Sequence, residues 1–448
     1  MKPKKFNVIL NSRIEPFKKT IKVDSDKSLS IRSFLIGSIS EDISIVKNVL
    51  ESEDVKSTIL ACKKLGIKIH KIAPKNYKIY GKGLGCFVAK KNLKLNFGNS
   101  GTLARLLIGI LSTNPNIDIN VLGDSSLNKR NMRELINLMS KFGAEFLPKN
   151  KFYFPLKIIS SEKPVGIYYN AGVSAQLKSA VILAGLNSYG VTTIEEKIKS
   201  RDHTENLLIK NFKAVRIKKK SKKVIKIYGK QRLKRLNINI SGDPSSAAFF
   251  TTLTLLNPNS SIKIKNVGLN PSRTGFYQIL KKQNAKIKFI NLKKKNNEIS
   301  GDVLVYSSEL KSIITSADMY PSTTDEYLLL FLIAGLQKGV SKFKGISNLA
   351  NKESSRAYEM KKILNQVGIK CNLSKNEMKI YGRGMIDASN KKIIVKNLGD
   401  HRIAMSAFIL AILTNAKTSI KNFETVFTSS PSFLKIMRTL GAKFEIQK

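Results

Sequence analysis

Cationic and hydroxyl side chains gather at residues 26–32, directly before an apolar stretch. Lys27, Ser28 and Arg32 are followed by residues 33–39, whose apolar spacing predicts a buried helical body. The first turn of a helix offers four unpaired N–H groups and the positive end of the dipole, and the three side chains add further donors. Such an end is suited to bind a phosphate or a carboxylate. An ordinary capped helix with solvated charges is the alternative interpretation.

Five later segments share this design of a small or polar head followed by an apolar body. Their heads hold side chains such as Gln176, Asp325 and Arg402, whereas a cap needs only one Ser, Asp or Asn. We therefore expect the six helix starts to point into one cleft between domains and to act together on an anionic ligand. The five segments are residues 98–111, 170–186, 242–256, 323–336 and 399–413.

The elements that must position these heads also repeat. A basic amphipathic helix end, a turn residue and a short strand recur six times, about 75 residues apart. Gly or Asn at five of the turns suits a left-handed helix end, and Lys213 departs from that preference. With Val- and Ile-rich strands between the helices, this predicts six α/β units, three in each of two domains. The turn residues are Gly66, Gly143, Lys213, Asn284, Gly368 and Gly441.

The chain carries a large positive charge. Among its 448 residues, 79 Lys and Arg against 31 Asp and Glu give a net charge of +48. A basic surface attracts nucleic acid, anionic membranes or small anionic substrates. The excess is mostly Lys, spread along the whole chain without interleaved aromatic residues, which does not favour nucleic-acid binding as the main function. We expect small anionic substrates, no nucleic acid and no membrane partner.

The three cysteines, Cys62, Cys86 and Cys371, lie far apart and form no C-x-x-C or Cys/His cluster. Neither a disulfide framework nor a zinc site is indicated, and no metal is expected. The apolar part of the N-terminus is too short for a signal peptide, and no apolar window is long enough to span a membrane. We therefore expect a cytoplasmic protein.

Ten motifs follow one another along the chain and are specific as an ordered set, although each alone is weak. On these motifs the chain resembles the 5-enolpyruvylshikimate-3-phosphate synthases, or 3-phosphoshikimate 1-carboxyvinyltransferases, of the enolpyruvyl transferase family. The motifs lie at residues 26–32, 98–105, 123–130, 174–180, 200–205, 242–247, 325–326, 352–356, 399–405 and 428–431.

The resemblance implies an α/β (α+β) fold, the two-domain inside-out α/β barrel of the enolpyruvyl transferases, with six βαβαββ repeats, three per domain. The first strand would cross into the C-terminal lobe. The N-terminal-lobe domain would then be residues 26–243, and the C-terminal-lobe domain residues 1–25 and 244–448, with the active site in the cleft between them. Family members are usually monomers, and we expect the same here.

By resemblance, the reaction transfers the enolpyruvyl group of phosphoenolpyruvate to the 5-hydroxyl of shikimate 3-phosphate and releases phosphate. It proceeds by addition to a tetrahedral intermediate and then elimination. This chemistry needs a base for the hydroxyl, an acid for the vinyl carbon, and cations around a carboxylate and two phosphates. Guanidinium and ammonium groups can provide the cations, so no cofactor is expected.

The family match assigns roles residue by residue. Asp325 matches the base for the 5-hydroxyl, and Glu353 and Lys27 match proton-transfer groups at the vinyl carbon. The charges of Lys352 and Arg356 on either side of Glu353 should bias its carboxylate, as in a working acid or base. The phosphoenolpyruvate positions are Lys27, Gly101, Arg130, Gln176, Arg356 and Arg402. The shikimate 3-phosphate positions are Lys27, Ser28, Arg32, Ser174, Ala175, Gln176, Ser200, Arg201, Asp325 and Lys352.

Two alternative functions stay open at this point. A UDP-N-acetylglucosamine enolpyruvyl transferase would share the fold and the chemistry, but residues 26–32 and 200–203 favour a small phosphorylated acceptor. An RNA-binding protein of the related cyclase-like fold would account for the net charge. It would not need Asp325 and Glu353 within a cationic cleft.

Some positions fall outside the assigned roles. Thr428 stands where many relatives have Lys, so one cation of the phosphate pole is missing or supplied elsewhere. His203 and His401 lie beside acidic residues inside motifs, and we interpret both as structural hydrogen-bonding residues rather than catalytic ones.

Overall fold

A computed structural model describes residues 4–219, 222–295 and 297–448. The chain divides into two compact units. The N-terminal unit comprises Ser25–Ile240 with Lys294–Glu298, and the C-terminal unit comprises Met1–Asp24, Ser241–Lys293 and Ile299–Lys448. The chain therefore passes between units at 24/25 and 240/241, and again at 293/294 and 298/299. The limits expected from the sequence are 25/26 and 243/244.

Over the described residues, the strands of the N-terminal unit form three four-stranded sheets of one plan. In each sheet one edge strand pairs in parallel with its neighbour, and the other pairings are antiparallel. The first sheet has the order β14 (Asn237–Asn239), β3 (Ile43–Lys47), β5 (Asn76–Tyr80), β4 (Lys68–Ala73). The second is β6 (Lys94–Asn96), β7 (Asp118–Leu122), β9 (Leu156–Ile159), β8 (Glu145–Leu147). The third is β10 (Tyr168–Ala171), β11 (Val191–Glu196), β13 (Lys223–Tyr228), β12 (Val215–Lys219).

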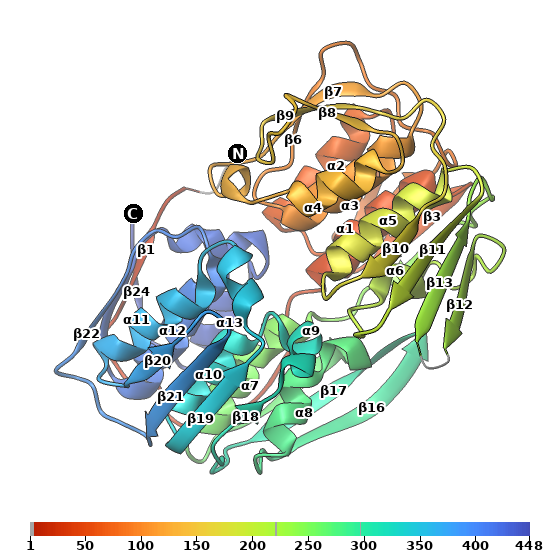
Figure 1. Cartoon of the computed structure of the whole chain (residues 1–448). Coiled ribbons are helices and arrows are strands. Elements are labelled where there is room, and N and C mark those ends of the chain that lie inside the picture. Colours follow the sequence, from red (N-terminus) through yellow and green to blue (C-terminus); the bar gives the residue numbers. More distant parts are fainter. Residues whose placement is uncertain (1–3, 220–221, 296) are drawn as a thin grey trace. The chain divides into compact units, whose positions relative to one another are not determined.

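Three helices of the N-terminal unit, located in Figure 1, are buried almost all round and begin at several of its candidate site residues. They are α1 (Lys27–Ile39), α3 (Gly101–Thr113) and α5 (Ala175–Leu186), whose bodies are apolar or carry small hydroxyls. The hydroxyls of Ser33 and Ser38 stay satisfied because each donates to the carbonyl four residues earlier. α3 and α5 approach closely at Gly109, where a Cβ would lie 2.6 Å from the carbonyl oxygen of Ala180. The other helices are α2 (Glu53–Lys64), α4 (Arg133–Ser140), α6 (His203–Leu207) and the 3₁₀ helix η1 (Leu127–Lys129).

The sheets of the C-terminal unit follow the same plan, and two of them use strands from the start of the chain. β1 (Asn7–Leu10) pairs antiparallel with β23 (Lys417–Ile420) and β24 (Glu445–Gln447), while β22 (Lys392–Val395) pairs in parallel with β23. β2 (Lys18–Ile21) pairs in parallel with β15 (Ser261–Gly268), in a sheet completed by β17 (Glu298–Tyr306) and β16 (Ile287–Lys295). The third sheet has the order β18 (Ile314–Thr315), β19 (Lys338–Lys344), β21 (Glu377–Arg383), β20 (Cys371–Leu373).

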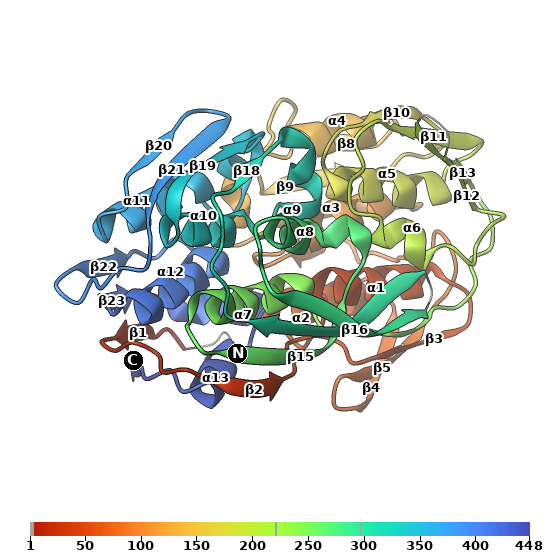
Figure 2. The ribbon, with the colours of Figure 1, turned by 90° about the horizontal axis from the view of Figure 1, so that it is seen from below.

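Three buried helices, α7 (Pro244–Leu256), α10 (Tyr327–Gly335) and α12 (His401–Thr414), pack against one another in the C-terminal unit (Figure 2). Phe408 of α12 packs edge to face on Phe433 and Phe444, with ring centroids 5.4 and 5.3 Å apart. The other helices are α8 (Gly275–Lys281), α9 (Tyr320–Thr323), α11 (Arg356–Gln366) and α13 (Phe433–Thr439), with the 3₁₀ helices η2 (Pro271–Arg273), η3 (Ala317–Met319), η4 (Ser347–Asn351) and η5 (Phe423–Thr428).

The six predicted helix heads each open a buried helix. Asp26, Ser100, Ser174, Asp243 and Asp400 cap five of these helices by accepting a backbone N–H. The turn residues Gly66, Gly143, Asn284, Gly368 and Gly441 adopt the expected left-handed backbone.

The third repeat differs from the prediction. The sequence pattern extended a helix toward Lys213, but α6 ends at Leu207. The N–H of Ile209 bonds the carbonyl of Asn206 and that of Asn211 bonds Leu208, so the chain leaves the helix in tight three-residue turns. Lys213 has no left-handed backbone, and the helix end that a Gly would have formed there is absent.

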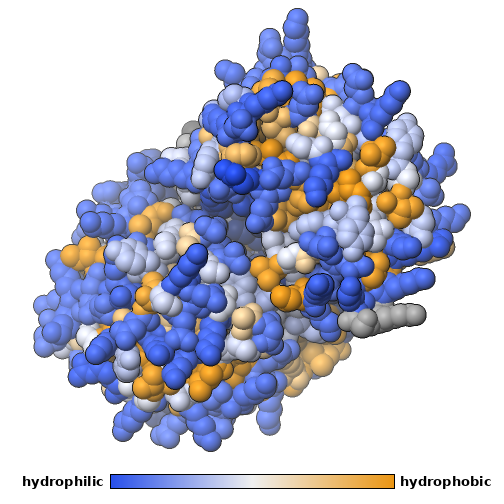
Figure 3. All heavy atoms as spheres, viewed as in Figure 1, coloured by the Kyte–Doolittle hydropathy of each residue, from blue (hydrophilic) through white to orange (hydrophobic). Residues whose placement is uncertain are grey.

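Hydrophilic side chains cover most of the face seen in Figure 3, as expected from the abundance of Lys. In the part of the chain that the structure describes, every helix is too short or too polar to cross a bilayer.

Candidate active site

The structure divides the predicted site residues into two sets, one in each unit. The N-terminal unit holds Lys27, Ser28, Arg32, Gly101, Arg130, Ser174, Ala175, Gln176, Ser200 and Arg201. The C-terminal unit holds Asp325, Lys352, Glu353, Arg356 and Arg402.

The start of α1 is fixed by ion pairs and hydrogen bonds. Lys27 Nζ lies 3.0 Å from Asp54 Oδ2 at the start of α2, and the side chain of Lys27 is 14% exposed. Arg32 is buried. Its Nε donates to Thr204 Oγ1 at 2.9 Å and its Nη2 donates to Ser179 Oγ at 3.2 Å. Because Ser179 lies on α5 and Thr204 on α6, Arg32 joins three helices beneath the predicted anion site.

The start of α3 places two guanidinium groups around one glycine. A Cβ on Gly101 would lie 2.7 Å from Arg130 Nη1 and 2.8 Å from Arg105 Nη1. Arg105 Nη1 also donates to Gln176 Oε1 at 3.0 Å, and Gln176 Nε2 donates to Thr102 Oγ1 at 2.9 Å. The Gln176 amide is therefore oriented from both ends. The missing side chain of Gly101 lets both guanidinium groups lie against the backbone at the start of α3.

The start of α5 and the segment before α6 carry the remaining residues of this set. Ser174 caps α5 with its hydroxyl, and Ala175 is the first helical residue. Ser200 is buried, and both its N–H and its hydroxyl donate to Glu196 Oε1, at 2.8 and 2.6 Å. Arg201 follows it and is half-buried.

One guanidinium binds three carboxylates in the C-terminal unit. Arg356 Nε donates to Asp400 Oδ2 at 2.9 Å and its Nη2 donates to Glu353 Oε2 at 2.6 Å. Arg356 Nη1 lies 3.5 Å from Asp325 Oδ1. Burial would lower the pKa of Arg356, but the carboxylates of Asp400, Glu353 and Asp325 outweigh it and raise the pKa above its ordinary value. The guanidinium is therefore a permanent cation.

A second arginine holds Asp325 from another side. Arg402 Nη1 donates to the backbone carbonyl of Asp325 at 3.3 Å, and its Nε lies 3.5 Å from Asp325 Oδ1. The side chains of Asp325 and Glu353 are 19% and 17% exposed, so both carboxylates remain accessible. This half of the site combines accessible carboxylates for proton transfer with cations for an anionic ligand.

Both histidines make side-chain contacts away from these carboxylates. His203 Nδ1 lies 2.9 Å from Glu298 Oε1, and His401 Nδ1 lies 3.3 Å from Thr428 Oγ1. These contacts fit the structural roles expected from the sequence. Thr428 hydrogen-bonds His401 and the carbonyl of Thr425. Within the described ranges, no group of three or more His, Cys, Asp or Glu could hold a metal ion.

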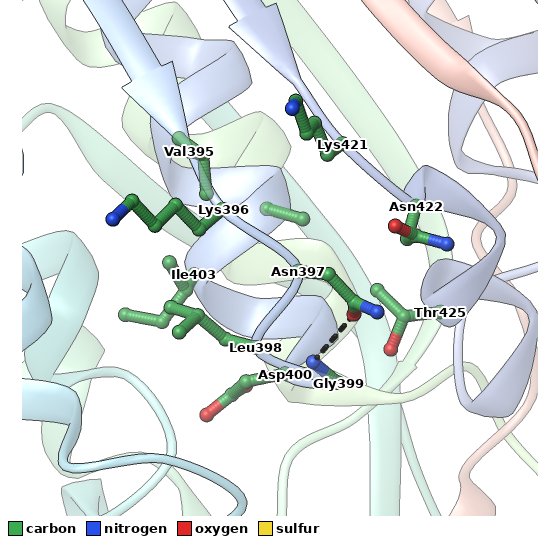
Figure 4. Close-up of a pocket in the computed structure, with 11 residues that line it drawn as sticks. Val395, Lys396, Asn397, Leu398, Gly399, Asp400, Ile403, Lys421, Asn422 and Thr425 are labelled. Carbon is green, nitrogen blue, oxygen red and sulfur yellow. Dashed lines mark hydrogen bonds between the residues drawn. The ribbon is translucent and has the colours of Figure 1, made fainter.

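A pocket of about 200 Å³ lies beside the start of α12 and is lined by residues 395–400, 403–404, 421–422 and 425 (Figure 4). The ammonium groups of Lys396 and Lys421 point away from Asn397 and Asp400. The carboxylate of Asp400 is already bound to Arg356. None of the predicted substrate residues lines this pocket.

Sequence reasoning missed three residues that orient the site. Arg105 stands in the motif at residues 98–105, one helical turn after Gly101, but the sequence assigned it no role. Asp400 precedes His401 in a recognised motif, but only the fold places it against Arg356. Glu196 lies outside every motif, and nothing in the sequence pointed to its contact with Ser200.

Comparison with known proteins gives one consistent family. The model of the family EPSP synthase (3-phosphoshikimate 1-carboxyvinyltransferase) matches residues 12–437. A 3-phosphoshikimate 1-carboxyvinyltransferase of Paramagnetospirillum magneticum is 35% identical over 435 residues, which cover 96% of each chain. The same enzyme of Petrotoga mobilis is 37% identical over 422 residues, covering 94% of this chain and 96% of the relative.

Solved structures agree in fold. An EPSP synthase of Acinetobacter baumannii superposes with a TM-score of 0.83 and 32% identity, covering 99% of this chain and 100% of the other. The enolpyruvyl transferase NikO of Streptomyces tendae superposes with a TM-score of 0.75 at 12% identity, covering 99% of this chain and 98% of the other, and this likeness concerns the fold alone. The mixed α/β fold expected from the sequence is thereby confirmed.

Proposed function

The chain belongs to the EPSP synthase family of 3-phosphoshikimate 1-carboxyvinyltransferases, and from this we propose how its residues divide the family's reaction among them. It is an enzyme that transfers enolpyruvyl from phosphoenolpyruvate to shikimate 3-phosphate, in the biosynthesis of aromatic amino acids. In our proposal the 5-hydroxyl adds to the substituted vinyl carbon while the terminal carbon gains a proton. The tetrahedral intermediate then loses phosphate and a proton from the same terminal carbon.

We also propose the finer details of the fold. We take it to be the inside-out α/β barrel with six βαβαββ repeats, three per domain, and with both domains acting on one pair of substrates. The three similar sheets and three mutually buried helices of the C-terminal unit support the repeat count. The limits 26–243, and 1–25 with 244–448, remain the proposed domains.

The acceptor is bound, in our proposal, mainly by the N-terminal unit. Its phosphate and hydroxyls are anionic or polar, and the starts of α1 and α5 offer backbone N–H groups, hydroxyls and guanidinium groups. The network from Arg32 to Ser179 and Thr204 supports this role, because it fixes the guanidinium before the ligand arrives. The proposed acceptor residues are Lys27, Ser28, Arg32, Ser174, Ala175, Gln176, Ser200, Arg201, Asp325 and Lys352.

Phosphoenolpyruvate, with its carboxylate and phosphate, requires more cations. Arg130 beside Gly101, and Arg356 with Arg402, are suited to this because guanidinium groups bind both kinds of anion in a bidentate manner. The proposed residues are Lys27, Gly101, Arg130, Gln176, Arg356 and Arg402. No cofactor is part of the proposal.

Proton transfer falls to Asp325, Glu353 and Lys27. The observation that carries the proposal is the set of contacts made by Arg356, which holds Asp325 and Glu353 together beside Arg402. Asp325 would take the proton of the 5-hydroxyl. Glu353 and Lys27 would serve the vinyl carbon, one giving a proton on addition and one removing it on elimination.

The partners in this proposal are small anionic substrates. We propose a monomer that acts in the cytoplasm, without nucleic acid or membrane. The carboxylates of Asp325 and Glu353 beside Arg356 have no purpose in an RNA-binding surface, and this favours the enzyme over that alternative.

The test is an assay of phosphate release by the purified protein. We expect release from phosphoenolpyruvate only when shikimate 3-phosphate is present, together with formation of the enolpyruvyl product. UDP-N-acetylglucosamine is the control acceptor. Release with that acceptor, and none with shikimate 3-phosphate, would overturn the proposed acceptor.

A further inference from the structure

Four charged side chains are buried together in the N-terminal unit, next to Ser200. Lys178 Nζ lies 2.7 Å from Glu196 Oε1 and 2.8 Å from Glu205 Oε1. Lys223 Nζ lies 3.1 Å from Glu196 Oε2 and 2.9 Å from Glu205 Oε1. The side chains of Lys178 and Glu196 are fully buried. Removing four ions from water is costly unless each one is paired, so the cluster depends on this geometry.

The charges of the cluster are fixed. Burial raises the pKa of the Glu196 carboxyl, but the ammonium groups of Lys178 and Lys223 outweigh it and lower the pKa to about 2. Burial and the same two lysines act on Glu205, and its pKa falls below its ordinary value. Burial lowers the pKa of Lys223, but the two carboxylates raise it to about 12. Both carboxylates therefore remain ionised at any pH near neutrality.

Besides its ion pairs, Glu196 also accepts hydrogen bonds from Ser200. It is the last residue of β11, and its Oε1 accepts both the N–H and the hydroxyl of Ser200. The carboxylate thus closes residues 197–200 into a loop held against the end of the strand. Arg201 is the next residue along the chain, so its backbone starts from a fixed point.

We propose that Lys178, Glu196, Glu205 and Lys223 are positioning residues for the acceptor, acting through Ser200. Glu196 holds Ser200 in place, and this determines where the Arg201 guanidinium meets the phosphate of shikimate 3-phosphate. This inference rests on the proposed function, which assigns Ser200 and Arg201 to the acceptor.

Lys178 extends the effect to a second element. It lies on α5, one turn after Ser174, and joins the body of that helix to Glu196. Glu205 brings in α6 in the same way. The start of α5 and the loop before α6 therefore keep a constant distance from each other, as recognition of one phosphate by both would require.

A cluster that served only stability would be replaceable by apolar side chains of similar volume. A positioning cluster makes a different prediction. Its loss weakens binding of shikimate 3-phosphate, while the KM for phosphoenolpyruvate and the turnover at saturating acceptor stay near their parental values.

The first test is the charge-balanced variant Glu196→Leu/Lys178→Met, which leaves the pair of Lys223 and Glu205 intact. We expect the Kd and KM for shikimate 3-phosphate to rise roughly tenfold or more. Glu196→Gln/Lys178→Met returns an acceptor oxygen for Ser200 and should recover most of the lost affinity. Ile158→Ala, in a distant buried strand of the same unit, is the matched control for lost stability and should keep the parental KM.

A milder variant covers the case in which the first does not fold. Glu196→Asp keeps the charge but withdraws the carboxylate by one methylene, so it should weaken shikimate 3-phosphate binding by a smaller factor. Parental binding by Glu196→Asp, or by a folded Glu196→Leu/Lys178→Met protein, would overturn the inference. Arg201→Gln separates it from the proposed function. If Arg201→Gln binds the acceptor normally, the assignment of Arg201 is wrong; if it binds weakly while the cluster variants bind normally, only the positioning role fails.

Discussion

Arg356 contacts both candidate catalytic carboxylates, Asp325 and Glu353. It is 2% exposed and contacts Asp400, Glu353 and Asp325 at the same time. Asp400 is buried and caps α12, so its carboxylate is fixed in place and holds the guanidinium of Arg356 by a hydrogen bond. Glu353 and Asp325 are then held by a cation that cannot lose its charge. Their orientation is set before substrate binds, which is what efficient proton transfer needs.

Glu353→Gln tests the proton-transfer role at this site. The amide is of the same size and can still accept from Arg356, but it cannot exchange a proton. We expect kcat to fall by ~10²–10⁴, the size of a general acid or base contribution, with substrate binding largely kept. Glu359→Gln, on the helix α11 that follows Glu353 and in a surface pair with Lys362, is the matched control and should keep its turnover. Unchanged kcat in Glu353→Gln would show that its assigned role is wrong.

Gly101→Ala tests the close approach at the start of α3. The new methyl would lie 2.7 and 2.8 Å from nitrogens of Arg130 and Arg105, which are the ends of flexible side chains. The protein should therefore fold, but both guanidinium groups must move. We expect the KM for phosphoenolpyruvate to rise by roughly tenfold, more than the KM for the acceptor. Steady-state kinetics with each substrate varied in turn would check this, and equal KM values to the parent would count against Arg130 as a phosphoenolpyruvate ligand.

The sequence predicted residue types better than residue contacts. Asp325, Glu353 and Arg356 stand in motifs, and the structure does bring their side chains together. Arg105 and Glu196 were assigned no role because their contacts with Gln176 and Ser200 appear only in the fold. Gln176 lies 71 residues from Arg105 in the sequence, and Ser200 lies four residues from Glu196. A single sequence does not show which side chains meet across helices, so such supporting contacts emerge only from packing.

At the scale of elements, helix packing determines how well the site is held. α3 and α5 carry Gly101 and Gln176 at their first turns, so a change in their separation would move both. Gly109 sets that separation, because a Cβ there would lie 2.6 to 3.0 Å from backbone atoms of Ala180. Backbone atoms cannot move aside as a flexible side chain can.

Gly109→Ala should therefore destabilise the protein by about 1–3 kcal/mol, the usual cost of overpacking a core. Gly172→Ala is the matched control, because nothing lies within 4 Å of its Cβ position. Urea unfolding of both variants would measure the difference. Equal free energies of unfolding would mean that the two helices separate more easily than their packing suggests.

Element prediction was wrong for the helix of the third repeat. The repeat placed a helix through residue 212, yet α6 ends after five residues at Leu207. Glu205 of that helix forms ion pairs with Lys178 and Lys223. The other five turn residues obeyed their local preference, since Gly and Asn accept a left-handed backbone at little cost.

For the whole molecule, the high positive charge means that acid should lower the free energy of unfolding more than alkali does. Protonation of the 31 acidic side chains would raise a net charge that is already +48. It would also remove the partners of buried cations, among them Arg356 and Lys178. Both effects destabilise the folded state in the same direction.

The free energy of unfolding should therefore fall as the pH drops from about 4.5 toward 2. The pKa of Glu196 is about 2 in the folded protein against an ordinary value of 4.5. As the pH falls through this range, the unfolded chain binds the proton before the folded protein does, and this favours unfolding. This one group accounts for about 3 kcal/mol across the window. Denaturant unfolding at several pH values would check it, and Glu196→Gln/Lys178→Met should flatten the dependence. A parental slope in that variant would exclude Glu196 as the source.

The pairing of β1 has a consequence for how the protein is made. β1 lies between β23 and β24, with Val8 opposite Ile420 and Ile446. β1 leaves the ribosome before its partners, and more than 400 residues are synthesised between β1 and β23, so β1 stays unpaired during that time. The N-terminal unit, Ser25–Ile240, draws nearly all its residues from one continuous stretch and can fold in the meantime. Translation therefore leaves the edges of β1 unpaired until β23 and β24 have been made, and during this interval chaperones or self-association would act on the strand.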